Sequence, residues 1–424
     1  MTPRVYLDWA ASAPPESAAV QEAADVSLRC FGNPSSPHGA GREAAERLED
    51  ARSRLARLID ATPGEVIFTS GGTESNTSLL LSLLHRYRLG GSERRKAHVV
   101  TTAIEHASIY DQARSLEAYG MACTIVKPQP NGIVDPQAIV DALHGDTVCV
   151  SVMLVNNETG AIQEIRDVAD RVREFSARGG RKILVHTDAV QALGKIPVSV
   201  RALGVDAASF SAHKTGGPRG IGALYLKSGT DPGFLSVGGG QEAGRRPGTE
   251  NVAGACAFVA AAEQRIGKLE ENRASASLLM GYLLSGLREI RASRIFPETR
   301  AGRDAEDFSP YILSAGFPPL PGEVVVRVAD SRGFCIATGS ACSTKKKDRT
   351  RVPESMGLDH QTALSAIRIS IGPSTTAEEI EGFLAVLREE MPPLLSISQG
   401  HGEIRDEGDS KGSPVTPTEA PRAR

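Results

Sequence analysis

The sequence predicts an α/β protein with a mostly parallel sheet covered by helices, followed by a smaller α+β domain. The first observation is the alternation of helical and strand-like segments from about residue 43 onward. The second is that the strand-like segments are short, continuously apolar runs, as in strands buried on both faces. The third is the length of 424 residues, which suggests two or three domains. Helices between such strands imply crossover connections over both faces of one sheet.

The first block of the chain begins with two helices. Glu43–Ile59 and Asn76–Leu89 carry apolar residues at helical spacing. Strands are expected in seven further segments, which are Val66–Thr69, His98–Thr101, Cys123–Val126, Val148–Val155, Ile183–His186, Ala207–Ser211 and Gly222–Leu226. These segments would form the parallel sheet.

The second block follows a long helical region at about 252–292. Strands are expected at Tyr311–Ser314, Val324–Val328 and Ala366–Ile371, and a helix at Thr376–Met391. We expect a large domain over 16–260 and a small domain made of 1–15 and 261–395. Residues 396–424 are rich in Gly, Ser, Pro, Thr and charges, which is typical of a disordered tail.

Charge and cysteine content exclude several classes of protein. The chain has 48 Lys plus Arg and 51 Asp plus Glu, so its formal charge of −3 would attract neither nucleic acid nor an anionic membrane. Its six cysteines form no CxxC pair, which argues against a zinc cluster or a dense disulfide framework. The sequence shows neither a signal peptide nor an apolar run long enough to cross a membrane, so we expect a cytoplasmic protein.

Lys214 lies at the end of a strand in AASFSAHKTGGPRGIGALYL. A lysine that forms a Schiff base must be partly desolvated, and flanking glycines allow a cofactor to approach closely. Asp188, in KILVHTDAVQALGK, follows a neighbouring strand, so the two side chains could face one crevice. Pyridoxal phosphate uses this pair of residue types, a lysine for its aldimine and an acid for its ring nitrogen. A solvent-facing lysine in a turn and a helix-capping aspartate are the alternatives.

Several other residues could complete such a site. Gly72 and Thr73 open a helix after a strand, where free N–H groups can bind a phosphate, and Ser211 and His213 lie near the lysine. His106 could stack on a ring or relay protons. Asn157 and Gln191 could contact a ring oxygen. Plain turn and structural roles explain these residues as well.

Two residues of the second block could act on a substrate. Cys342, in ATGSACST, lies among small residues ahead of a basic run, and nearby cations favour a nucleophilic thiolate. Arg368, in SAIRISIG, alternates with apolar neighbours, so burying it calls for an anion such as a substrate carboxylate. A buried structural cysteine is the alternative for Cys342.

The order of motifs resembles the cysteine desulfurases, specifically the group of the NifS and IscS enzymes within the class V, fold-type I pyridoxal-phosphate enzymes. The similarity covers nearly everything before residue 390. It includes YLDWAASAP, FGNPSSPHGAG, FTSGGTESN, EHASI, VNNETG, HTDAVQALGK, SFSAHKTGGPRGIGAL, GGGQEAGRRPGTENV, TGSACST and AIRISIG.

The resemblance implies a fold, a reaction and a role for each candidate residue. Its fold would be a large domain with a seven-stranded, mostly parallel sheet plus a small domain, in a homodimer. Pyridoxal 5'-phosphate would be the cofactor and L-cysteine the substrate. A persulfide on Cys342 would then deliver sulfur to acceptors in iron–sulfur cluster, thio-cofactor or tRNA thiolation pathways. No resident metal is implied, although Cys342 could briefly ligate a transferred iron–sulfur cluster. The implied roles are Lys214 as aldimine lysine, Asp188 at the ring nitrogen, His106 stacked on the ring, Gly72, Thr73, Ser211 and His213 on the phosphate with Thr249 of a second subunit, Asn157 and Gln191 at the ring hydroxyl, and Arg368 with Asn33 on the substrate carboxylate.

Two other hypotheses remain. A selenocysteine lyase or an aminotransferase-type enzyme would keep the cofactor and leave Cys342 incidental. A catalytically silent assembly partner would lack the lysine or the acid, whereas Lys214 and Asp188 are both present.

Overall fold

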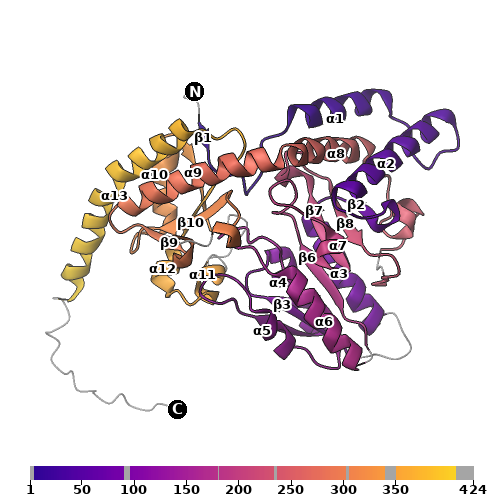
Figure 1. The fold of residues 1–424 in the computed structure, drawn as a ribbon, viewed down its shortest axis with the longest axis horizontal. Helices are drawn as coiled ribbons and strands as arrows, with labels where there is room; N and C mark the ends of the chain where they lie inside the picture. Colours follow the sequence, from indigo (N-terminus) through magenta and orange to yellow (C-terminus); the bar gives the residue numbers. More distant parts are fainter. Residues whose placement is uncertain are drawn as a thin grey trace, which may run out of the picture.

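The computed structural model describes residues 4–89, 96–179, 181–233, 236–301, 305–339 and 350–406. A large sheet with its helices forms one part of the molecule, and a smaller sheet flanked by α9, α10 and α13 forms the other (Figure 1). The bounds of these three helices are Leu269–Glu289, Gly322–Ser331 and Ala377–Asp406. The predicted fold class is confirmed.

The large sheet has seven strands in the order β2-β8-β7-β6-β5-β3-β4. Every neighbouring pair is parallel except the two pairs made by β8, which is antiparallel to β7 and β2. The bounds are β2 Val66–Thr69, β3 His98–Thr102, β4 Ala122–Val126, β5 Thr147–Ser151, β6 Leu184–Asp188, β7 Ala207–Ser211 and β8 Gly222–Leu226. All seven strands coincide with expected segments, although β5 ends four residues before the expected end at Val155.

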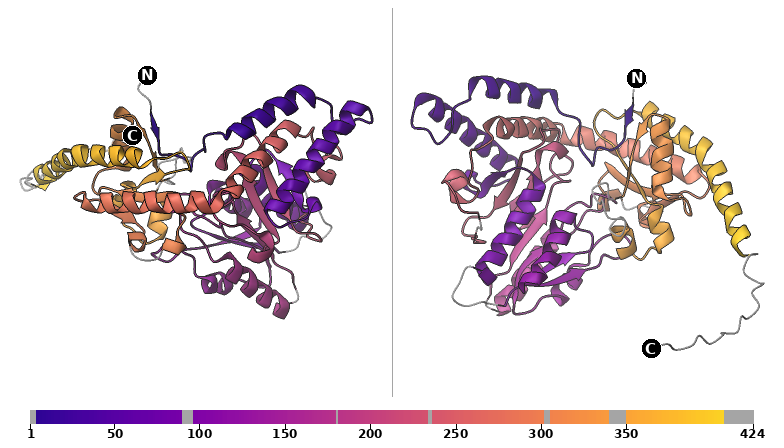
Figure 2. Two further views of the ribbon diagram at one scale, coloured as in Figure 1. Left: turned by 45° about the horizontal axis from the view of Figure 1, so that its top comes forward. Right: turned by 180° about the vertical axis from the view of Figure 1, so that it is seen from behind.

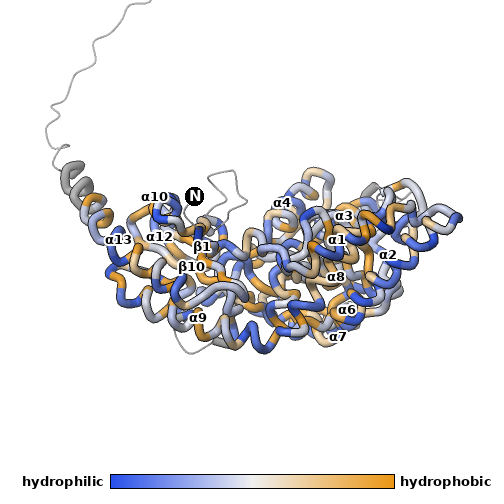
Figure 3. Tube along the Cα trace, turned by 90° about the horizontal axis from the view of Figure 1, so that it is seen from above, coloured by the Kyte–Doolittle hydropathy of each residue, from blue (hydrophilic) through white to orange (hydrophobic). Residues whose placement is uncertain are grey.

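Helices cover both faces of this sheet because successive strand residues point to opposite sides. Val66 and Phe68 of β2 belong to one hydrophobic cluster and Ile67 to another. The first cluster includes residues of α2, α5, α6, α7 and α8, and the second includes residues of α3 and α4. The helix bounds are α1 Ser17–Arg29, α2 Gly39–Leu58, α3 Gly72–Leu84, α4 Ala107–Leu116, α5 Pro136–Asp141, α6 Ile165–Gly179, α7 Val200–Leu203 and α8 Val252–Gly267. Hydrophilic and hydrophobic stretches alternate along the chain, as amphipathic helices require (Figure 3).

The smaller part combines the beginning of the chain with its C-terminal block. Its antiparallel sheet has the order β12-β13-β10-β9, and β1 pairs in parallel with β11. Figure 2 shows β1 beside the C-terminal block. Leu7 and Ala10 share one hydrophobic cluster with residues of α9, α10 and α13. The remaining bounds are β1 Val5–Tyr6, β9 Arg294–Phe296, β10 Ile312–Gly316, β11 Phe334–Cys335, β12 Ala337–Thr338, β13 Ile367–Ser370, α11 Arg351–Ser355 and α12 His360–Leu364. The division at residues 15 and 260 stays a prediction.

The strand expected at Val324–Val328 is wrong, because this segment lies inside helix α10. A run of valines suggests a strand, but Val325 and Ala329 are buried on one helical face. The long helical region at 252–292 is two helices, α8 and α9, which meet at Lys268. Helix α13 continues past residue 396, where we placed the start of the tail, and 407–424 lie outside the described residues. Among the described helices, none combines the length and apolarity of a membrane span.

Candidate active site

Lys214 ends a single 3₁₀ turn, Ala212–Lys214, directly after β7. Its Nζ donates to the carbonyl oxygens of Ala10 at 2.6 Å and Ala11 at 2.7 Å. The side chain is therefore held by the N-terminal segment of the small part and is not a solvent-facing residue of a turn. This contact places the amine where the two parts of the molecule meet.

Asp188 is the last residue of β6, and it is buried. Its Oδ2 accepts a hydrogen bond from Asn76 Nδ2 at 2.7 Å, and its Oδ1 accepts from Val190 N at 3.0 Å. An ionised carboxylate has about four lone-pair sites, so Asp188 can accept a further N–H. It caps the turn that follows and keeps an acceptor for a ligand.

Asn76 connects Asp188 to His106. Its amide nitrogen donates to Ser108 Oγ at 2.9 Å as well as to Asp188. Ser108 Oγ lies 2.8 Å from His106 Nδ1, which also accepts the Ser108 backbone N–H at 3.2 Å. Since Nδ1 accepts, the neutral imidazole carries its hydrogen on Nε2. His106 thus begins α4 with its ring oriented by the same chain of hydrogen bonds that holds Asp188.

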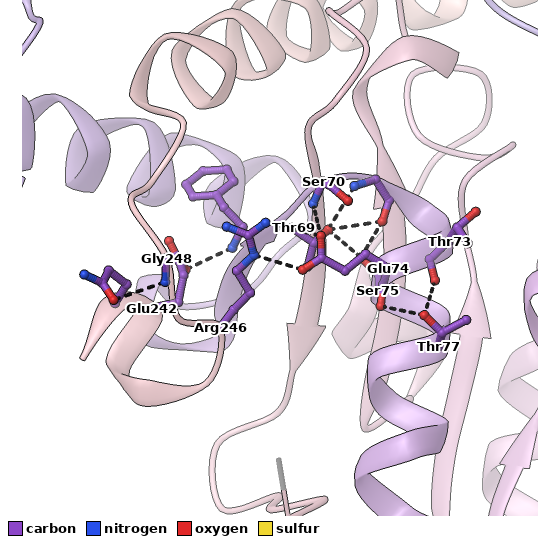
Figure 4. Close-up of polar contacts among 12 residues, drawn as sticks. Thr69, Ser70, Thr73, Glu74, Ser75, Thr77, Glu242, Arg246 and Gly248 are labelled. Carbon is purple, nitrogen blue, oxygen red and sulfur yellow. Dashed lines mark hydrogen bonds and ion pairs between the residues drawn. The ribbon is translucent and has the colours of Figure 1, made fainter. Parts of the chain in front are cut away.

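Four of the five predicted phosphate residues, Gly72, Thr73, Ser211 and His213, lie at or next to the start of α3. Gly72 lies so close to the turn after β6 and to β7 that an added Cβ would be 2.6 Å from Val190 Cγ2 and 3.6 Å from Ser211 Cβ. Ser211 Oγ lies 2.9 Å from His213 Nδ1. Burial together with the charges of Lys214, Lys195 and Arg219 lowers the pKa of His213 to about 4. A helix N-terminus, a hydroxyl group and a neutral imidazole therefore converge here. Thr73 is the second residue of the helix (Figure 4).

The two residues predicted to contact the ring hydroxyl each contact the small part of the molecule. Gln191 is buried, and its Nε2 donates to the Ala10 carbonyl oxygen at 2.9 Å. Asn157 offers its backbone carbonyl to Arg368 Nη1 at 3.1 Å. Arg368, on β13, also donates to Asp8 Oδ1 at 2.8 Å, so its buried charge is paired within the chain. Its Nε is buried without a hydrogen-bond partner among the described residues.

Three predicted residues are not joined to this cluster within one chain. Asn33 lies exposed between α1 and α2, which Figure 1 shows on the far side of the molecule from β10, the neighbour of β13. Thr249 is exposed in the segment that precedes α8. Cys342 lies outside the described residues.

The described residues on both sides of 340–349 lie beside the candidate site. An added Cβ at Gly339 would be 2.8 Å from Glu158 Oε2. Arg351 donates to the Glu105 carbonyl oxygen at 2.7 Å, and its guanidinium lies 4.0 Å from the centre of the Tyr110 ring. Burial raises the pKa of Glu158 to about 7, against the opposing charges of Arg351 and Arg368. The segment that carries Cys342 therefore begins and ends next to residues that surround His106.

A buried ion pair between Glu242 and Arg52 fixes the segment around Thr249 against the edge of the large sheet, and Figure 4 shows Glu242 beside Arg246 and Glu74. Glu242 binds Arg52 in a bidentate pair at 2.6 and 2.9 Å, and its Oε2 also accepts the N–H of Phe68 on edge strand β2 at 2.9 Å. Arg246 pairs with Glu74 at 2.9 Å near the start of α3. Glu242 adopts a left-handed backbone with φ 48°, a strained conformation that the surrounding contacts must hold. The segment is thus fastened to the strand and helix that present Gly72.

We expect Glu242→Gln to lower the free energy of unfolding by about 2 kcal/mol. Both carboxylate oxygens of Glu242 accept from Arg52, so the amide NH₂ of glutamine would point its hydrogens at a donor in either orientation. Glu49→Gln is a matched control, because Glu49 pairs with the same Arg52 at 3.0 Å but is 62% exposed. Urea titration of the two apoproteins measures the difference. Equal unfolding free energies for the two variants would contradict this assignment.

Three residues that were not predicted from the sequence hold the predicted ones in place. Asn76 joins Asp188 to His106, Asp8 pairs with Arg368, and Lys195 donates to Gln191 Oε1 at 2.6 Å. All three lie within motifs that carry the resemblance, FTSGGTESN, YLDWAASAP and HTDAVQALGK. Their position in those motifs was the available signal, but their partners come from distant segments.

The chain is similar to known proteins over most of its length. The model of the family described as Aminotransferase class-V matches residues 5–383. The cysteine desulfurase IscS of Dictyoglomus turgidum is 35% identical over 399 residues, which cover 94% of this chain and 97% of that protein. The putative cysteine desulfurase NifS of Bacillus subtilis is 36% identical over 381 residues, with 90% and 93% covered.

Solved structures resemble the chain over a similar length. A NifS-like protein has a TM-score of 0.82 and 34% identity, with 93% of this chain and all of that chain covered. SspA in complex with cysteine has a TM-score of 0.74 and 28% identity, and it covers 88% of this chain. This chain therefore belongs to the class-V aminotransferase family and, within it, to the cysteine desulfurases of the NifS and IscS group.

Proposed function

We propose that this protein is a pyridoxal-phosphate-dependent cysteine desulfurase that converts L-cysteine to L-alanine and transfers the sulfur to Cys342 as a persulfide. The observation that supports this most is the convergence of Lys214, Asp188, His106 and the start of α3 with both neighbouring ends of the segment that carries Cys342. Amine, acid, ring-stacking imidazole and thiol would then act in one place.

The residues present fit the cofactor. Lys214 offers the amine, and Asp188 offers a buried carboxylate that can still accept a ring N–H. The start of α3, together with Ser211 and His213, offers donors for a phosphate. Asn76 Oδ1 is buried without a hydrogen-bond partner among the described residues, and such an atom calls for a donor from a ligand or water. Bound pyridoxal phosphate supplies an electron sink for bonds broken at the substrate.

The chain's own residues would handle protons and sulfur. The Lys214 amine moves protons at the substrate, held near the Ala10 and Ala11 carbonyls until it is used. The thiolate of Cys342 attacks the substrate sulfur, so that an S–S bond forms and the C–S bond breaks. The electron pair of the C–S bond stays on the substrate carbon, which takes up a proton and becomes the methyl group of alanine. Arg368 would bind the substrate carboxylate through donors such as Nε, which has no partner among the described residues, while Asp8 holds the guanidinium.

A homodimer would bring in the two predicted residues that stand apart. Thr249 would reach the phosphate of a second copy, and a joint contact of Asn33 and Arg368 with one substrate would likewise need Asn33 from a second copy. Leu28 and Phe31 are 80% and 81% exposed in one chain, which supports a contact surface near α1.

The sulfur acceptor would be a protein of an iron–sulfur or thiolation pathway. The cytoplasm is the proposed compartment, because a persulfide-forming thiol must start reduced.

Product analysis separates this function from its rivals. With L-cysteine and a thiol reductant, a desulfurase releases alanine and sulfide in equal amounts. An aminotransferase-type enzyme would instead form a 2-oxo acid, and a selenocysteine lyase would act on L-selenocysteine and leave L-cysteine largely unchanged. Purified protein that forms no alanine from L-cysteine would overturn the proposal.

Asp188→Asn is expected to lower turnover of L-cysteine about a hundredfold, a typical cost of removing one preorganised electrostatic partner. Asparagine keeps the shape of the side chain and one of the two acceptors that bind Asn76 and Val190, but it loses the charge that keeps a ring nitrogen protonated. Asp206→Asn is the control, since Asp206 is equally buried but precedes β7 at the opposite end of the sheet. Rates are compared per bound cofactor. Equal losses in the two variants would mean that Asp188 acts only through stability.

A further inference from the structure

Lys195 is an amine that the proposed reaction does not use, although it lies beside the residues that the reaction needs. It donates to Gln191 Oε1 at 2.6 Å, and together with Lys214, Trp9 and Tyr311 it lines one small cavity. Burial and the charges of Lys214, Arg265 and Arg368 lower its pKa well below the usual value. Keeping a lysine in such surroundings costs stability, so its position calls for a role.

The nearby arginines have carboxylate partners, whereas Lys195 has an amide. Arg265 pairs with Glu16 at 2.6 Å and Arg368 with Asp8 at 2.8 Å. Over the described ranges, no carboxylate lies within ion-pair distance of Lys195. The interaction that defines its position is therefore the hydrogen bond to Gln191.

Gln191 is held from both ends. Its Oε1 accepts from Lys195, and its Nε2 donates to the Ala10 carbonyl oxygen at 2.9 Å. A carbonyl oxygen only accepts, so the amide nitrogen must face Ala10 and the amide oxygen must face Lys195. Nε2 has two hydrogens, and the second remains available to an acceptor atom of a ligand.

The Ala10 carbonyl links this arrangement to the reactive amine, because it also accepts from Lys214 Nζ at 2.6 Å. When Lys214 is engaged elsewhere, Gln191 still satisfies this buried carbonyl. The order of contacts is Lys195, Gln191, the Ala10 carbonyl and Lys214. The segment at Ala10 can thus stay in place while the Lys214 amine leaves and returns.

We propose that Lys195 is a positioning residue, which holds the Gln191 amide in one orientation and thereby keeps the Ala10 carbonyl and a free amide hydrogen in place for the cofactor and Lys214. This inference rests on the proposed function, since it assumes that pyridoxal phosphate binds beside Lys214.

The test is binding of pyridoxal 5'-phosphate to the apoprotein, followed by absorbance. Lys195→Met removes the donor and would leave Gln191 Oε1 buried without a partner, so we expect binding to weaken about tenfold. Lys195→Arg restores a donor and should recover most of the affinity. Lys182→Met is the matched control, because Lys182 is a 63% exposed lysine that lies two residues before the start of β6.

A double-mutant cycle with Gln191→Ala distinguishes positioning from a direct effect. If Lys195 acts through Gln191, Lys195→Met should have little further effect on binding in the Gln191→Ala background. An equal loss in both backgrounds, or unchanged binding in Lys195→Met, would overturn the proposal. Urea unfolding of the apoproteins checks the fold, and if Lys195→Met does not fold, Lys195→Gln enters the same cycle with the same criteria. Wild-type protein that fails to bind pyridoxal phosphate would instead overturn the proposed function.

Discussion

Lys214→Ala is expected to lower the turnover of L-cysteine by about a thousandfold or more, within the range for loss of a residue that transfers protons in catalysis. The substitution removes the amine that would carry the cofactor and move protons at the substrate. It also removes the only side-chain donor that reaches both Ala10 and Ala11 among the described contacts. Alanine formation measures the loss of turnover, and dialysis of the loaded protein shows whether the cofactor is still retained.

Lys182→Ala controls for the loss of a lysine as such. Lys182 is 63% exposed and lies 3.4 Å from Asp206, away from Ala10 and Gln191. It should keep wild-type turnover. Turnover of Lys214→Ala within about tenfold of wild type would show that Lys214 is not the proton-transferring lysine.

Cys342→Ser is expected to reduce alanine formation by about a thousandfold while leaving cofactor binding unchanged, because a hydroxyl is a far weaker nucleophile than a thiolate. None of the residues that fit the cofactor lies in the segment 340–349. The measurement is alanine release from L-cysteine in the presence of a thiol acceptor, together with absorbance of the bound cofactor.

Cys123→Ser is the matched control. Burial raises the pKa of the Cys123 thiol to about 12, so this thiol stays protonated and is a poor nucleophile at neutral pH. Serine there should not change turnover. If Cys342→Ser turned over like Cys123→Ser, Cys342 would not be the sulfur acceptor.

Much of the large sheet could be predicted because its strands are short apolar runs, and both faces of such strands are covered by helices. The segment Val324–Val328 shows where this reasoning fails. Its valines favour a strand locally, but Pro321 precedes a helix that buries Val325 and Ala329 against the small sheet. Tertiary packing there overrides β propensity.

The candidate reactive residues could be chosen from the sequence, whereas the partners that the structure gives them could not. Lys214 and Asp188 are recognisable by type and by position at strand ends. Asp8 reaches Arg368 across 360 residues, and Ala10 contacts Lys214 across 204 residues through a backbone carbonyl, which has no side-chain signature. Asn33 and Thr249 show the opposite problem, because the single chain places them apart from the residues they were predicted to join.

The central claim is that sulfur passes from L-cysteine to Cys342. It is tested most directly by mixing the loaded enzyme with L-cysteine, blocking free thiols, and measuring alanine together with the mass of the peptide that contains Cys342. We predict that this peptide gains the mass of one sulfur atom for each alanine formed in the first turnover. Alanine formed without any gain of sulfur on that peptide would contradict the account.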